Sequence, residues 1–107
     1  GFDRNLYDST NITLPVAYSA IKGGLNSLNR YFASYFGRYN IRCNCISPGG
    51  IYDKHEKKFV SNYTKKVPLG RMGNTNDVAP AVVFLLSDAS SYITGQNIYI
   101  DGGLTII

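Results

Sequence analysis

Side chains that bind metals or form disulfides are scarce in this sequence. Its 107 residues include two cysteines, one histidine, one methionine and no tryptophan. Cys43 and Cys45 lie two apart in a predicted strand, where they share a face but splay too far for good disulfide geometry. We therefore expect reduced, buried thiols. A C-x-C pair with His55 as the single histidine lacks the ligand spacing of a zinc site, so no metal is predicted.

Long apolar runs and strong charge are absent as well. No stretch of about 18 apolar residues could span a bilayer, and no basic-then-apolar leader is present. The net charge is +4, and six of the eleven basic residues fall between positions 54 and 71. We expect a cytoplasmic protein with neither a membrane nor a nucleic-acid partner. The hydrophobic content of 44%, with 13% aromatic residues, is that of one packed globular unit.

Tyr18 and Lys22 form the pair that points most directly to chemistry. Residues four apart lie one above the other on a helical face, so the Lys22 ammonium can approach the Tyr18 phenol. One cation about 4 Å away, at an effective dielectric of ~20, stabilises a phenolate by about 4 kcal/mol, or roughly three pK units. Such a tyrosine exchanges protons near neutral pH. An ordinary solvated lysine fits the same spacing, so the surrounding residues must decide.

Hydrophobic spacing predicts a long helix over residues 15–37. Pro15 suits its first turn, and Gly37 offers a C-terminal cap. The turn-forming composition of residues 1–14 predicts a loop before this helix. The mostly apolar run 41–46, followed by Ser-Pro-Gly-Gly, predicts a buried parallel strand that ends in a tight turn. In open α/β sheets, ligands bind beyond the carboxyl ends of such strands.

The second half of the sequence predicts two more helices and a strand. Residues 53–66 suit a short basic helix, most simply a solvated surface helix. Its apolar side carries Phe59, Val60 and Tyr63. Asn74 or Thr75 can cap a helix whose apolar stripe is so broad that it should be largely buried. Pro80 would kink that helix unless it falls in the first turn, and residues 97–100 are predicted to form a strand.

The order helix, strand, helix, helix, strand is typical of part of a layered α/β domain with right-handed crossovers. Two strands cannot make a sheet with both faces covered, so the fold is incomplete within residues 1–107. We expect the remaining strands to come from residues before Gly1 or from another chain.

Four motifs occur together in one order. They are Tyr18 with Lys22, Asn44 leading to Ser47-Pro48-Gly49, Pro68 to Gly73, and Phe84 to Asp88 followed by Gly95 and Asp101-Gly102-Gly103. Together they resemble the C-terminal half of the compact short-chain dehydrogenases/reductases, from about Pro15 to the end of the chain. The resemblance implies that residues 1–107 are the C-terminal segment of a single dinucleotide-binding domain, with a Rossmann-like, doubly wound parallel sheet. It also implies an oxidoreductase that uses NAD or NADP and a small carbonyl/alcohol substrate.

The resemblance assigns roles to the residues of the first two motifs. Tyr18 would be the acid/base that gives a proton to a carbonyl oxygen or takes one from an alcohol. Lys22 would lower the pKa of Tyr18 and hydrogen-bond the nicotinamide ribose. The Pro48-Gly49 turn would lie along the nicotinamide, while Gly50 and Ile51 would offer backbone contacts to its carboxamide. Glycines let a backbone approach a flat ring closely, although a tight turn without a ligand is the competing interpretation.

The sequence departs from the family pattern before Tyr18. Family members usually place a catalytic serine at the position that Asn5 occupies here. Ser9 could replace it only in a rearranged loop, so we expect the serine to lie upstream of Gly1. The family's glycine-rich dinucleotide turn also has no counterpart in this sequence. We therefore expect these residues alone neither to hold a dinucleotide firmly nor to catalyse efficiently.

Two other functions remain compatible with the sequence. A catalytically inactive remnant would keep the family's oligomer-forming helices as an assembly module, and either form is expected as a homodimer or homotetramer. A sugar-nucleotide epimerase or dehydratase would use the same Tyr/Lys pair but generally carries a longer C-terminal region. The basic stretch from Lys54 to Arg71 occupies the place of the family's substrate-covering loop, so it either meets an anionic substrate or forms a solvated surface.

Overall fold

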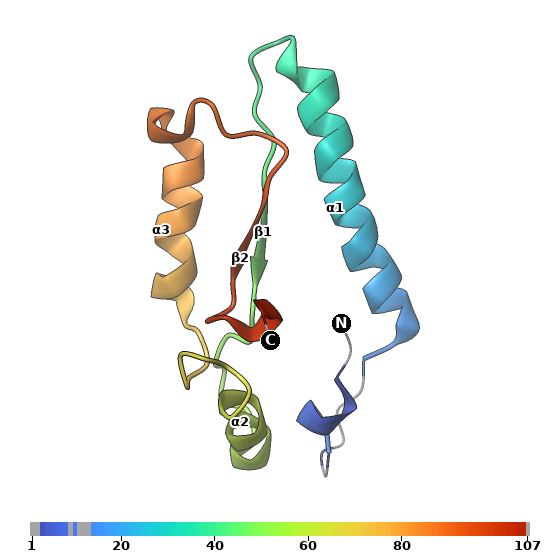
Figure 1. Ribbon diagram of the computed structural model, residues 1–107, viewed down its shortest axis with the longest axis vertical. Coiled ribbons are helices and arrows are strands. Elements are labelled where there is room, and N and C mark those ends of the chain that lie inside the picture. The colour runs from blue at the N-terminus through green and yellow to red at the C-terminus, as the bar shows by residue number, and fades with distance from the viewer. Residues whose placement is uncertain (1–2, 9, 11–13, 107) are drawn as a thin grey trace.

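Two short parallel strands lie between two helices in the computed structural model, which describes residues 3–8, 10 and 14–106 (Figure 1). The helices on opposite sides of the sheet are α1 (Val16–Gly37) and α3 (Thr75–Leu86), and the strands are β1 (Cys45–Pro48) and β2 (Asn97–Ile100). Beyond the carboxyl ends of the strands lies α2 (Lys57–Thr64). Single turns of 3-10 helix are η1 (Arg4–Leu6), η2 (Asp88–Ser90) and η3 (Leu104–Ile106). The predicted α/β architecture with parallel strands is confirmed.

The strand predicted at residues 97–100 is confirmed, whereas the strand predicted at 41–46 lies further along the chain, at Cys45–Pro48. The position of β1 follows from its partner, because Cys45 pairs with Asn97 and Pro48 with Ile100. Ahead of Asn97 the chain turns at Gly95, whose φ is +73°, so no regular ladder can form there. Both strands therefore end together, at the side of the sheet where α2 lies.

Side-chain hydrogen bonds hold the segment ahead of β1. The Arg42 guanidinium donates to the carbonyls of Leu85 (2.8 Å) and Ser87 (3.2 Å) at the end of α3. It also reaches the carbonyl of Ile93 (3.2 Å), which accepts a second bond from the Asn44 amide (2.8 Å). Carbonyls at a helix C-terminus lack helical partners and carry partial negative charge, so a cation is favourable there. The sequence pattern had indicated no role for Arg42.

The ends of α1 differ from the prediction, although its span is close to the predicted 15–37. Pro15, with ψ of 145°, precedes the helix instead of lying in its first turn. Gly37 is the last helical residue, and the left-handed conformation falls at Asn40, with φ of +59°. Asparagine visits this region more readily than most residues because its short polar side chain can bond locally. The predicted capping role of Gly37 is therefore wrong.

A small hydrophobic cluster lies where α2 meets the N-terminal segment. Its buried members are Leu6, Phe59, Tyr63, Val67 and Met72. Part of the segment predicted as a loop forms η1, which packs on α2. Next to η1, the rings of Tyr7 and Phe59 are 5.9 Å apart, and Lys66 contacts the carboxylate of Asp3. The helix predicted at 53–66 is shorter, and one side of it is buried instead of solvated.

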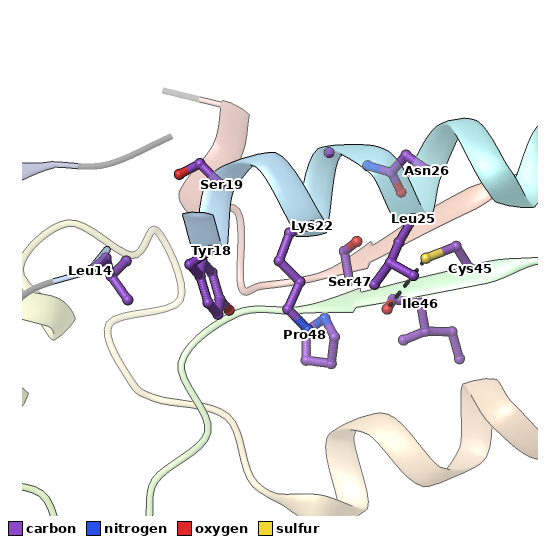
Figure 2. Close-up of a pocket in the computed structure, with 11 residues that line it drawn as sticks. Leu14, Tyr18, Ser19, Lys22, Leu25, Asn26, Cys45, Ile46, Ser47 and Pro48 are labelled. Carbon is purple, nitrogen blue, oxygen red and sulfur yellow. Dashed lines mark hydrogen bonds between the residues drawn. The ribbon is translucent and has the colours of Figure 1, made fainter. Parts of the chain in front are cut away.

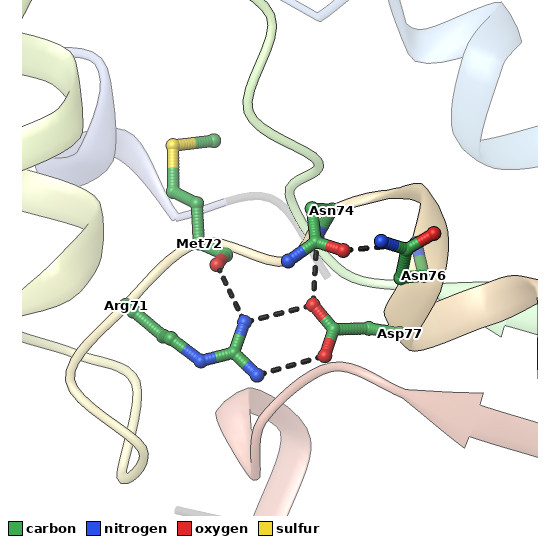
Figure 3. Close-up of polar contacts among 5 residues, drawn as sticks. All are labelled: Arg71, Met72, Asn74, Asn76 and Asp77. Atoms are coloured by element: carbon green, nitrogen blue, oxygen red, sulfur yellow. Dashed lines mark hydrogen bonds and ion pairs between the residues drawn. The ribbon is translucent and has the colours of Figure 1, made fainter.

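The predicted cap of α3 is confirmed at Asn74. Its side chain accepts from the backbone N–H of Asn76 (2.8 Å), while the Asp77 carboxylate accepts from the Asn74 N–H (2.8 Å), which completes a capping box. Arg71 adds two parallel bonds of 2.8 Å to the same carboxylate and donates to the carbonyl of Met72 (Figure 3). The start of α3 is thus tied to the segment that precedes it.

The predicted burial of α3 is wrong in this chain. Within α3, which the structure describes in full, Leu85 is buried while Val83 and Leu86 are 67% and 81% exposed. Two strands are too few to cover both helices, and a cavity of about 480 Å³ opens between α1 and α3 beside β1. Pro80 lies inside α3, beyond its first turn. Within the described ranges, no helix is long and apolar enough to cross a bilayer.

Replacing Asp77 by Asn should remove a pH-dependent contribution to stability. The hydrogen bond from Arg71, followed by that from the Asn74 backbone, lowers the pKa of Asp77 from 3.8 to about 2. A lowered folded-state pKa stabilises the protein fully above pH 3.8, and this contribution is lost as the pH falls through about 2. We expect a lower urea midpoint for Asp77→Asn at pH 7, measured on the full-length protein, and a smaller difference from wild type in acid. Exposed Asp53→Asn is the control, and an undiminished difference near pH 2 would contradict the assignment.

Candidate active site

Tyr18 and Lys22 lie on one face of the first turns of α1, as their spacing predicts. The Lys22 Nζ atom is 5.5 Å from the centroid of the Tyr18 ring, within the range of a cation–π contact. Both side chains point from α1 toward β1 (Figure 2). The Tyr18 residue is 47% exposed, so its hydroxyl remains within reach of a bound molecule. A phenol beside an ammonium in such a position is suited to proton transfer.

An open groove separates the start of α1 from β1 (Figure 2). We call it the Tyr18 groove, and its volume of about 440 Å³ is within the range of ligand-binding clefts. It is lined by Leu14, Tyr18, Ser19, Lys22, Gly23, Leu25, Asn26, Cys45, Ile46, Ser47 and Pro48. A phenol and an ammonium therefore face a cleft at the carboxyl end of β1, where open α/β sheets bind ligands.

The turn after β1 passes from this groove to α2. Pro48 lines the Tyr18 groove, whereas Gly49 and Gly50 line a smaller cavity of about 140 Å³ together with Tyr63. The backbone N–H of Gly50 donates to the Tyr63 hydroxyl. Ile51 forms a single parallel bridge with Gly73. The structure thus brings three of the six predicted site residues, Tyr18, Lys22 and Pro48, into one groove, and the other three continue away toward α2.

Protein atoms crowd the two glycines of this turn. A Cβ added at Gly49 would lie 2.8 Å from the Asp101 Cα, and one added at Gly50 would lie 2.7 Å from the Tyr63 Cζ. Both distances are shorter than Cβ contacts in real proteins, so neither position accommodates a larger residue without movement. The sequence predicted close approach of a ligand ring here. In the structure, the close neighbours at these glycines are Tyr63 and Asp101.

The sequence did not predict a role near the site for the phenol of Tyr7 or the carboxyl of Asp101. Burial, followed by the nearby phenols of Tyr18 and Tyr63, raises the pKa of Tyr7. Bonding from the Thr105 hydroxyl (2.6 Å) lowers the pKa of Asp101, which also accepts from backbone N–H groups of the closing turn. Tyr7 lies in a segment without periodicity, so no sequence signal marked it. Asp101 was visible only as part of the closing Asp-Gly-Gly motif.

Asn5, which stands at the position where the family resemblance expects a serine, is not among the residues that line the Tyr18 groove. The backbone N–H of exposed Asn5 donates to the Asp3 side chain (2.9 Å), and Ser9 lies outside the described residues. Of the basic residues between positions 54 and 71, Lys66 contacts Asp3 and Arg71 contacts Asp77. Among the described residues, no three metal-binding side chains gather at one place.

Comparison with known proteins finds one matching family model and several similar reductases. The model of a family described as enoyl-(acyl carrier protein) reductase matches residues 7–105. A tropinone reductase homolog of Arabidopsis thaliana is 43% identical over 95 residues, which are 83% of this chain and 36% of that protein. The 3-oxoacyl-[acyl-carrier-protein] reductase of Homo sapiens is 46% identical over 91 residues, or 84% of this chain and 38% of that protein. The chain thus spans little more than a third of the length of these relatives.

Solved structures of dehydrogenases are also similar to this chain. A short chain dehydrogenase of Leptospira borgpetersenii with bound NAD+ superposes with a TM-score of 0.86 at 45% identity, covering 97% of this chain and 39% of that one. A gluconate 5-dehydrogenase of Burkholderia cenocepacia in complex with NADP and tartrate gives a TM-score of 0.82 at 30% identity, covering 91% and 41%. The predicted partial, Rossmann-like doubly wound fold is confirmed by these neighbours.

Gly50→Ala should destabilise the protein, because the new Cβ would overlap the Tyr63 ring. Overpacking of this kind costs roughly 1–3 kcal/mol, measured as the free energy of unfolding in urea. Gly37→Ala is the matched control, since nothing lies within 4 Å of its added Cβ. In a Tyr63→Leu background the further loss caused by Gly50→Ala should be smaller. An equal loss in both backgrounds would show that the ring is not the cause.

Proposed function

This chain belongs to the short-chain dehydrogenase/reductase family, and on that premise we propose that the full-length protein is an NAD(P)-dependent oxidoreductase. It interconverts a carbonyl and an alcohol by hydride transfer, with Tyr18 as the proton donor or acceptor. The relatives named above act as reductases or dehydrogenases on several substrates, so a small carbonyl or alcohol is the substrate class. Because the chain spans little more than a third of its curated relatives, the activity is proposed for the full-length protein, and these residues alone are expected to be inactive.

The placement of Tyr18 and Lys22 in one groove beside the end of β1 carries this proposal. In reduction, the Tyr18 hydroxyl gives its proton to the carbonyl oxygen, and in oxidation the phenolate takes a proton from the alcohol. The Lys22 ammonium lies over the ring and stabilises the negative charge that the phenol carries after it has lost the proton. The half-exposed position of Tyr18 leaves its oxygen accessible to substrate.

The residues of the Tyr18 groove fit the nicotinamide end of NAD or NADP. When bound, the nicotinamide supplies or accepts the hydride. Lys22 donates to the hydroxyls of the adjoining ribose, and the Pro48-Gly49 turn lies along the ring in this proposal. Gly50 and Ile51 continue that turn toward the carboxamide. Neighbouring structures of the family contain NAD+ or NADP, which supports this cofactor class without choosing between the two.

We also propose that the full-length protein forms a homodimer or homotetramer in the cytoplasm. Support for assembly comes from the family resemblance, because the helix that carries the Tyr/Lys pair usually builds subunit contacts in compact members of the family. Support for a reducing compartment comes from Cys43 and Cys45, both of which are free thiols.

Tyr18→Phe should abolish oxidoreductase turnover, because phenylalanine keeps the ring but has no proton to transfer. The full-length protein would be assayed by the fall in NADH or NADPH absorbance with tropinone or an acetoacetyl thioester, and by the rise in that absorbance from NAD+ or NADP+ with L-rhamnose or gluconate. For any combination of dinucleotide and substrate that the wild type turns over, we expect kcat/KM to fall by about 10²- to 10⁴-fold in the variant. Binding of the dinucleotide should survive.

Tyr31→Phe is the matched control for this prediction, since Tyr31 also lies on α1 but is not among the residues that line the Tyr18 groove. Its kcat/KM should stay at the wild-type value. Turnover that persists in Tyr18→Phe would refute the role of Tyr18. A full-length protein that binds neither dinucleotide but still oligomerises would support the inactive assembly module instead.

A further inference from the structure

The hydroxyl of Tyr63 lies against the turn that follows β1. It accepts a hydrogen bond from the backbone N–H of Gly50, and a Cβ at Gly49 would lie 2.9 Å from the same oxygen. The ring itself comes within 2.7 Å of the place a Cβ at Gly50 would take. The phenol therefore touches two successive residues of the turn that the proposed function assigns to the nicotinamide.

The hydrophobic cluster to which Tyr63 belongs holds its ring, and with it the hydroxyl, in place. Tyr63 is only 5% exposed, and its ring centroid lies 6.0 Å from that of Phe59 within the cluster. The cluster is tied to the N-terminal segment through Leu6 and through the packing of Tyr7 on Phe59. A buried tyrosine hydroxyl needs a polar partner, and here the Gly50 amide is that partner.

The carbonyl side of Gly50 is held from a second direction. The Gly73 N–H donates to the Gly50 carbonyl (2.9 Å), and the Tyr52 N–H donates to the Gly73 carbonyl (2.9 Å). In extended backbone, successive peptide groups point to opposite edges. Since the groups flanking Ile51 face Gly73, the N–H and carbonyl of Ile51 itself face the opposite edge.

We propose that Tyr63 is a positioning residue for nicotinamide binding. Its hydroxyl holds the N–H of Gly50 while Gly73 holds the Gly50 carbonyl, and these two bonds together aim the backbone groups of Ile51 at the carboxamide. The inference rests on the proposed function. Phenylalanine at position 63 would fill the same space but leave the Gly50 amide without its partner, so the peptide could rotate. Tyr18 and Lys22 belong to another element, α1, so the proton-transfer pair would keep its geometry.

The experiment compares Tyr63→Phe with wild type in the full-length protein by two measurements. The first is amide hydrogen exchange of the peptide that contains Gly50, in the dinucleotide-free protein, where the variant should exchange about tenfold faster. The second is the Kd of NADH and NADPH from fluorescence titration, which should rise about tenfold for the dinucleotide that the wild type binds. At saturating dinucleotide, kcat should stay within about threefold of wild type. Tyr92→Phe, at a fully exposed tyrosine, is the matched control for both measurements.

Each outcome decides between distinct explanations. Unchanged exchange in Tyr63→Phe would show that the bond does not protect the turn and would overturn the inference. Faster exchange with an unchanged Kd would also overturn it, because Tyr63 would then be merely structural. A fall in kcat at saturating dinucleotide with an unchanged Kd would contradict a positioning role toward the nicotinamide. Failure of the wild type to bind either dinucleotide would instead refute the proposed function, and the positioning role with it.

Discussion

The parallel pairing of β1 with β2 determines where the other elements of the site lie. Four residue pairs, from Cys45 with Asn97 to Pro48 with Ile100, bring the ends of both strands to one side of the sheet. The turn after β1, the Asp101 turn after β2, the start of α1 and α2 all meet there (Figure 1). Such a short ladder needs support, and Arg42 provides it by joining the segment ahead of β1 to the carbonyls at the end of α3.

The narrow sheet explains the distribution of buried and exposed residues. Two strands cannot cover two helices, so α1 and α3 leave apolar side chains exposed on either side of the cavity beside β1. The cluster around Phe59 and Tyr63 behaves differently, because η1 and α2 close over it. Most of the buried apolar side chains therefore lie around the ends of the strands, next to the candidate site.

The candidate site combines a part that could be predicted with a part that could not. The shared face of Tyr18 and Lys22 depends only on helical periodicity, and Pro48, the last residue of β1, lies across the groove from them. At Gly49 and Gly50, the atoms nearest to an added Cβ belong to Tyr63 and Asp101, and no sequence signal indicated these contacts. No local sequence pattern predicts the contact between Gly50 and Tyr63, because it depends on how α2 packs against the turn that follows β1.

The sequence by itself determined the features that depend on neighbours a few residues away. These include the face shared by Tyr18 and Lys22, the cap at Asn74 and the strand at residues 97–100, because periodicity and side-chain capping act over single turns. The tertiary structure alone decided the register of β1, the burial of Tyr63 beneath Gly50 and the bonds of Arg42. Each of these interactions joins residues that are distant in the sequence, so the two residues meet only when the chain has folded.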